Sequence, residues 1–136
     1  EVGEIVRLDV VDKEDAVRVA NIDHRRLAQS RIIGRRQLDR APAALTQLPE
    51  VVAAVETRAL VALDSGIRRG ADVVTALALG ADVVVVGRLA AVALAAGGRA
   101  GVERMHALLR EEIRTILMLL GVPSVRALDR TLLQAA

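Results

Sequence analysis

The stretch Val61-Ala62-Leu63-Asp64-Ser65-Gly66-Ile67-Arg68 and the later stretch Asp82-Val83-Val84-Val85-Val86-Gly87-Arg88 determine the fold class. In each stretch, a short apolar run is followed by a segment that contains a glycine and an arginine. We predict that the runs form the strands Ala59–Leu63 and Asp82–Val86, and that the amphipathic segment Ala71–Leu79 between them forms a helix. Two strand–loop–helix units in succession indicate a parallel sheet covered by helices.

The remaining sequence extends this pattern to about four βα units, in a chain of 136 residues that we interpret as a single domain, 1–136. We expect further strands at Ile5–Val10 and Leu27–Ile33, a loop at Ala41–Leu48, and helices over Lys13–Asn21, from Pro49 onward and over Val102–Leu120. A complete eight-unit barrel needs about 250 residues. The chain is therefore half a barrel, a small open sandwich, or a protomer that completes a barrel with a partner. Open strand edges predict a homo-oligomer.

The composition excludes several kinds of chemistry. Phe, Tyr and Trp are absent, so no base or flavin ring can stack on a Tyr or Trp of this chain. Cysteine is absent too, which excludes disulfides, thiol catalysis and cysteine-based metal sites, and we predict no metal. Neither a secretory signal nor a membrane span is visible, so we expect a cytoplasmic protein.

The charge balance gives little support to nucleic-acid binding. The formal net charge is only +2, and Lys13 is the single lysine. An arginine-rich segment, Arg25–Arg36, allows a nucleic-acid patch as an alternative, with binding that falls steeply with salt. A solvated face or an anion site explains this segment more simply.

The ends of the two strands carry chemistry suited to a phosphate group. Ligands of parallel α/β folds bind at the carboxyl ends of the strands. Gly66 allows a tight turn and a close approach to an anion, and Arg68 offers a planar bidentate donor. We expect the following helix to present free backbone N–H groups. Gly87 and Arg88 repeat the arrangement. The alternative interpretation is that both glycines only make turns and both arginines are solvated.

The same stretches resemble a known family. Asp64-Ser65-Gly66-Ile67-Arg68-Arg69-Gly70-Ala71-Asp72 and Gly87-Arg88, with Gly34-Arg35-Arg36-Gln37-Leu38-Asp39 upstream and Gly97-Gly98-Arg99-Ala100-Gly101 downstream, resemble the C-terminal half of the FMN-dependent 2-hydroxy-acid oxidases and dehydrogenases. Glycolate oxidase, lactate oxidase and mandelate dehydrogenase belong to that family. The resemblance implies a parallel βα repeat that forms the C-terminal half of a TIM (β/α)8 barrel.

The resemblance also implies roles for individual residues. It assigns the FMN phosphate to the two loops, at positions Asp64, Ser65, Gly66, Ile67, Arg68, Gly87 and Arg88. It assigns the substrate carboxylate to Arg36. A small 2-hydroxy acid would bind only if a first barrel half completed the site.

The catalytic position departs from the family pattern. The resemblance places the histidine base at Ile33, which cannot take a proton. His24 in its charged segment could replace the base, although a solvated histidine is the simpler interpretation, and His106 falls on the long predicted helix. We therefore expect a chain that keeps FMN-phosphate binding and is inactive alone. The alternative is a non-catalytic truncated or designed half-barrel that serves as a self-assembling scaffold.

Overall fold

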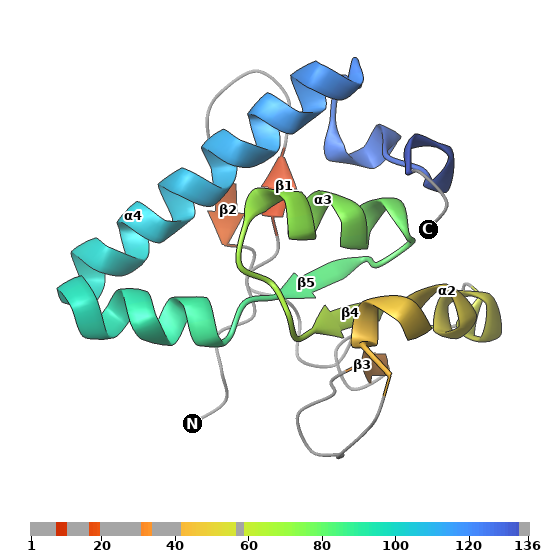
Figure 1. Cartoon of the computed structure of the whole chain (residues 1–136), viewed down its shortest axis with the longest axis horizontal. Coiled ribbons are helices and arrows are strands. Elements are labelled where there is room, and N and C mark those ends of the chain that lie inside the picture. The colour runs from red at the N-terminus through yellow and green to blue at the C-terminus, as the bar shows by residue number, and fades with distance from the viewer. Residues whose placement is uncertain (1–7, 11–16, 20–30, 34–41, 57–58, 134–136) are drawn as a thin grey trace.

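A three-stranded parallel sheet forms the centre of the computed structural model, which describes residues 8–10, 17–19, 31–33, 42–56 and 59–133 (Figure 1). The strands are β3 (Arg31–Ile33), β4 (Val61–Asp64) and β5 (Val83–Val85), in the order β3-β4-β5. Central β4 is buried along its first three residues, as expected for a strand covered on both faces. The predicted parallel sheet is confirmed, as are its two strands predicted at Ala59–Leu63 and Asp82–Val86, which correspond to β4 and β5.

The register of the sheet brings the strand ends together. Ile33 of β3 pairs with Leu63 of β4, and Asp64 of β4 pairs with Val85 of β5. Because all three strands run in the same direction, the chain leaves β4 and β5 at the same edge. This is the carboxyl edge of the sheet, where the two glycine–arginine loops begin.

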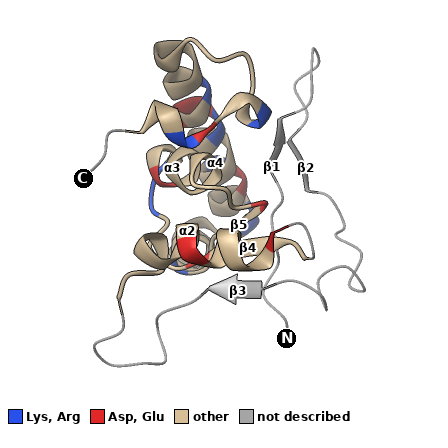
Figure 2. Cartoon of the chain, turned by 90° about the vertical axis from the view of Figure 1, so that its right-hand side faces the viewer, with Lys and Arg blue, Asp and Glu red and all other residues tan. Residues whose placement is uncertain are grey.

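In the described part of the chain, three helices follow the strands of this sheet: α2 (Ala44–Val55), α3 (Gly70–Ala78) and α4 (Arg88–Leu120). Two 3₁₀ turns come after α4, η1 (Val125–Ala127) and η2 (Arg130–Leu132). In two perpendicular views, α3 and α4 lie together on one side of β4 and β5, with α2 beside β4 (Figures 1 and 2). The core between these elements is aliphatic and includes Leu48, Leu63, Val73, Met105 and Ile113. In the described part of the chain, no helix is long and apolar enough to cross a membrane.

Two predictions for the first half of the chain are wrong. Residues Val17–Val19 form strand β2, although we predicted a helix there, and β2 pairs antiparallel with β1 (Leu8–Val10) in a separate sheet. Alternating β-branched valines favour a strand over a helix at this position. Among the described strands, β1 therefore does not join the parallel sheet as the first of four βα units.

Helix α2 begins earlier than predicted. We expected Pro49 to be the first helical residue after a loop, but the helix starts at Ala44 and contains Pro49. Proline cannot donate the backbone hydrogen bond that closes a helical turn. Burial of Ala44 and of Leu48, which is 0% exposed, offsets this loss by covering apolar surface.

Helix α4 also begins earlier than predicted, and it contains a sharp bend. The helix starts at Arg88 instead of Val102, and its two segments, 88–96 and 99–120, are separated by non-helical backbone at Gly97 and Gly98. The segments touch, because a Cβ atom at Gly101 would collide with the backbone carbonyl oxygen of Ala93. The second segment buries Met105, Leu109, Ile113 and Leu117, which recur at helical spacing, whereas Leu120 at its end is exposed.

Candidate phosphate site at the carboxyl edge of the sheet

The loop after β4 turns away from the sheet through two residues with positive φ. Ser65 has φ +112° and Gly66 has φ +85°. Glycine adopts this conformation without strain, whereas serine does so at a cost. No atom lies within 4 Å of the place that a Cβ on Gly66 would occupy, so the backbone there is open to a ligand.

Ile67 decides which way the rest of this loop faces. Its side chain is 8% exposed and belongs to the core cluster. Its neighbours, Gly66 and Arg68, are both exposed. An apolar side chain between two exposed residues holds the loop against the sheet and leaves Arg68 directed outward.

The loop after β5 leads directly into helix α4. Gly87 precedes the first helical residue, Arg88, and its carbonyl oxygen accepts a hydrogen bond of 3.0 Å from the Ala91 N–H. The N–H groups of Arg88, Leu89 and Ala90 therefore lie in the first turn, where helix geometry provides no acceptor. Together with the helix dipole, such groups attract anions.

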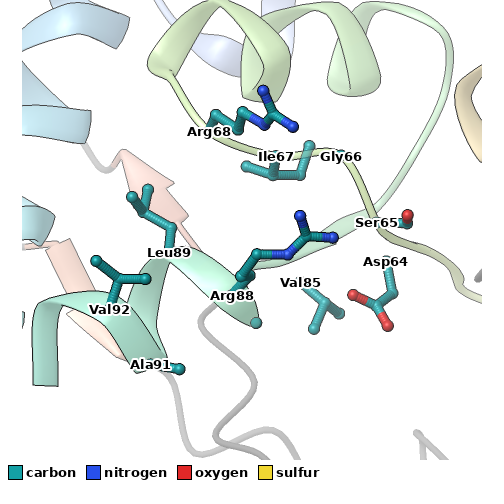
Figure 3. A pocket seen from close by; sticks show the side chains of 11 residues that line it. Asp64, Ser65, Gly66, Ile67, Arg68, Val85, Arg88, Leu89, Ala91 and Val92 are labelled. Atoms are coloured by element: carbon teal, nitrogen blue, oxygen red, sulfur yellow. The ribbon is translucent and has the colours of Figure 1, made fainter. Parts of the chain in front are cut away.

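The two loops border one cavity of about 640 Å³, which we name the carboxyl-edge groove. Its lining residues are Asp64, Ser65, Gly66, Ile67, Arg68, Val85, Gly87, Arg88, Leu89, Ala91 and Val92. Figure 3 shows Arg68 on the loop after β4 and Arg88 at the start of α4, with the Arg88 guanidinium directed toward Ser65. Both arginines are exposed, and no carboxylate of a described residue lies within 4.0 Å of either guanidinium. The groove therefore presents two positive charges that lack an ion-pair partner in the described part of the chain.

We predicted free backbone N–H groups at the N-terminus of α3. This prediction is wrong for three consecutive residues. The N–H groups of Arg68 and Arg69 donate to Asp72 Oδ2 at 2.8 and 3.0 Å. The Gly70 N–H donates to Glu112 Oε2 at 2.5 Å. Carboxylates of the chain itself occupy these donors, so an anion in the groove has the first turn of α4 and the two guanidiniums as its donors.

The structure brings together all seven residues that were predicted for phosphate binding, because each lines the carboxyl-edge groove. Sequence reasoning missed Val85, Leu89, Ala91 and Val92. Three of these lie on the first two turns of α4, and the helical period counted from Arg88 would have identified them had the helix been predicted to start there.

Four other positions that were considered from the sequence do not line the groove or lie outside the described residues. Arg36 and His24 lie outside the described residues. The backbone of Ile33 lies at the carboxyl end of β3, paired with Leu63, and is thus at the same edge of the sheet as the groove. His106 lies on the second segment of α4 and does not line the groove. Within the described ranges, no group of three histidine or acidic side chains could hold a metal ion.

Fold and site together define an α/β protein with a groove at the carboxyl edge of a parallel sheet, lined by Arg68 and Arg88. The sequence profile of FMN-dependent dehydrogenases matches residues 8–135. This chain belongs to the FMN-dependent dehydrogenase family. FMN is the family's cofactor, so the prediction of FMN is confirmed at the level of the family.

Individual relatives agree with this assignment. The chain is 47% identical over 100 residues to L-lactate oxidase of Nostoc sp., covering 74% of this chain and 27% of the oxidase. It is 52% identical over 98 residues to glycolate oxidase 3 of Arabidopsis thaliana, covering 72% and 27%. L-lactate dehydrogenase of Xanthomonas campestris is 42% identical over 137 residues, covering 95% and 34%.

Solved structures show the same likeness. A mandelate oxidase variant with a monooxide FMN adduct superposes with a TM-score of 0.71 at 43% identity, covering 75% of this chain and 33% of that one. A flavocytochrome b2 variant with pyruvate bound superposes with a TM-score of 0.73 at 38% identity, covering 78% of this chain and 29% of that one. The chain spans between about a quarter and a third of the length of the relatives it matches.

Proposed function

We propose that the carboxyl-edge groove binds the phosphate group of FMN. The observation that carries this proposal is the presence of Arg68 and Arg88 in one groove, without a carboxylate partner in the described ranges, beside the first turn of α4. The guanidiniums and the N–H groups of that turn would donate to phosphate oxygens. Open space at Gly66 allows the group to approach the backbone.

We further propose that this chain corresponds to the C-terminal half of a (β/α)8 barrel. The parallel order β3-β4-β5, with helices on the connections, is the arrangement of consecutive barrel units. A barrel of that kind would receive its remaining strands and further flavin and substrate contacts from a first half. Bound FMN would supply the acceptor for a hydride equivalent from the α-carbon of a small 2-hydroxy acid.

We propose that the chain alone does not catalyse this oxidation. We assign the family's histidine base to Ile33, whose backbone lies at the carboxyl end of β3, at the same edge of the sheet as the groove. Without a group that can take the hydroxyl proton, general-base catalysis is lost. Purified protein incubated with FMN and either lactate or glycolate is expected to show no flavin reduction under anaerobic conditions. Bleaching of the flavin absorbance by either substrate would overturn this part of the proposal.

Removal of both arginines tests the phosphate assignment. We expect Arg68→Ala combined with Arg88→Ala to weaken FMN binding by about tenfold for each arginine, because charge-assisted hydrogen bonds to phosphate are lost. The matched control is Arg104→Ala combined with Arg126→Ala, which removes the same charge from exposed positions that do not line the groove. Titration of flavin fluorescence measures both. Equal losses in the two double variants would show that net charge, and not the groove, determines binding.

A second candidate function is self-assembly. It is favoured by two features of the described part: β5 is the last strand of its sheet, and Met118 and Leu119 at the end of α4 are 73% and 82% exposed. Unpaired strand edges and exposed apolar side chains promote association. We therefore propose a homo-oligomer, for which light scattering is expected to give at least twice the chain mass. A compact monomer would contradict it.

A further inference from the structure

The arginine loop is held by two carboxylates from different helices. A single oxygen, Asp72 Oδ2, accepts hydrogen bonds from the N–H groups of Arg68 and Arg69. The next N–H along the chain, that of Gly70, donates to Glu112. Three consecutive backbone donors are thus fixed by charged acceptors, which form stronger hydrogen bonds than neutral ones.

From this arrangement we propose that Asp72 and Glu112 are positioning residues for the Arg68 guanidinium, an inference that rests on the proposed binding of FMN phosphate. The N–H groups of Arg68 and Arg69 belong to the two peptide planes on either side of the Arg68 Cα atom. When both planes are held by one carboxylate oxygen, the direction of the Cα–Cβ bond is fixed. The exposed Arg68 side chain therefore leaves the loop in a defined direction, toward the groove.

Glu112 extends this control to helix α4. Gly70 is packed so closely against the helix that an added Cβ would lie 2.6 Å from Glu112 Cβ and 2.9 Å from the Ile113 nitrogen. The same helix begins at Arg88, the other arginine of the groove. One helix thus carries Arg88 at its first residue and holds the loop of Arg68 through Glu112. The spacing of the two guanidiniums depends on this contact.

Neither carboxylate is suited to touch the phosphate itself. Both accept hydrogen bonds from the loop backbone, and an ionised carboxylate has no proton to donate to an anion. Asp72 and Glu112 are also absent from the lining of the carboxyl-edge groove. Their effect on an anion must pass through the backbone to Arg68.

Substitution of Glu112 tests the inference in the full chain, with FMN and riboflavin as probes. Glu112→Ala is expected to weaken FMN binding by about three- to tenfold and to leave riboflavin binding unchanged, since riboflavin lacks the phosphate. Glu112→Gln is expected to stay within about twofold of the unchanged protein, because its amide oxygen can still accept from Gly70. Glu111→Ala, an exposed neighbour on α4, is the matched control and should have no effect.

A double variant separates positioning from a general loss of structure. In an Arg68→Ala background, Glu112→Ala is expected to cause no further loss of FMN affinity. Equal losses in both backgrounds, an equal loss of riboflavin binding, or failure of Glu112→Gln to restore affinity would each overturn the inference. If Glu112→Ala does not fold by circular dichroism, Asp72→Ala and Asp72→Asn are compared in the same way, with the same expected pattern.

The same titrations distinguish this inference from the proposed function. If Arg68→Ala alone leaves FMN affinity unchanged, phosphate binding by the groove is wrong. If Arg68→Ala weakens FMN binding while Glu112→Ala and Asp72→Ala do not, the groove stands and only the positioning role is wrong.

Discussion

Ser65 and Gly66 share a backbone conformation that favours glycine, but Ser65 carries a Cβ atom. Both have positive φ, at +112° and +85°, and only one of them is glycine. A residue with a Cβ atom pays about 1 to 3 kcal/mol for such a conformation. The turn that opens the groove beside Arg68 is thus formed partly at the expense of stability.

This strain leads to a prediction for Ser65. Replacing it by glycine, Ser65→Gly, should raise the free energy of unfolding by about 1 kcal/mol, because relief of strain exceeds the added entropy of the unfolded chain. Gly66→Ala, the reciprocal change one residue later, should lower it by a similar amount. Urea unfolding followed by circular dichroism measures both. A stability that is unchanged or lower in Ser65→Gly would show that the turn is not strained.

At the residue scale, the sequence predicted the residues that line the groove better than it predicted the hydrogen bonds of the loop that carries Arg68. Asp64 through Arg68 and Gly87-Arg88 follow predictable strands, so parallel pairing alone brings them to one edge. The blocked N–H groups at the start of α3 were not foreseen. Asp72 is a recognisable capping residue in the first turn of α3. Glu112, however, lies 42 positions after Gly70 in the sequence, and only tertiary packing reveals the contact between them.

Among the elements, α4 has the largest influence on the site. Its first segment carries Arg88 and its second segment packs on α3, so the bend at Gly97 and Gly98 sets how the two meet. Close contact between Gly101 and the Ala93 carbonyl fixes the segments against each other. The position of Arg88 therefore depends on a residue that does not line the groove.

We predict that Gly101→Ala separates the two segments of α4. The added methyl group would collide with the Ala93 carbonyl oxygen, and overpacking of this kind costs about 1 to 3 kcal/mol. Both the free energy of unfolding and the affinity for FMN should fall. Gly97→Ala is the matched control, because no atom lies within 4 Å of its Cβ position and its φ is negative. Similar behaviour of the two variants would contradict the role of the contact.

Helix boundaries were predicted well only where the local sequence determines them. Gly80 and Gly121 have positive φ and follow the ends of α3 and α4, as glycine caps do. The start of α2 was missed because burial of Leu48 outweighs the effect of Pro49. Strand β2 was missed because it is formed by pairing with β1, and the sequence of a short segment does not reveal such a tertiary contact.

At the scale of the whole molecule, the parallel sheet concentrates the candidate chemistry at one edge. The ends of β3, β4 and β5 carry, in order, Ile33, the Arg68 loop and the Gly87-Arg88 segment. In our proposal this arrangement separates binding from catalysis, because the loops that suit a phosphate are present whereas the position that we assign to the base, Ile33, is isoleucine. The central claim that we propose is therefore that this chain recognises the phosphate of FMN.

A direct comparison of FMN and riboflavin tests that claim. The two flavins differ only in the phosphate, so the ratio of their dissociation constants isolates its contribution. Isothermal titration of the purified chain should give FMN at least about tenfold tighter binding than riboflavin, because even one charge-assisted contact contributes that much. Equal dissociation constants for the two flavins would contradict the assignment of the carboxyl-edge groove.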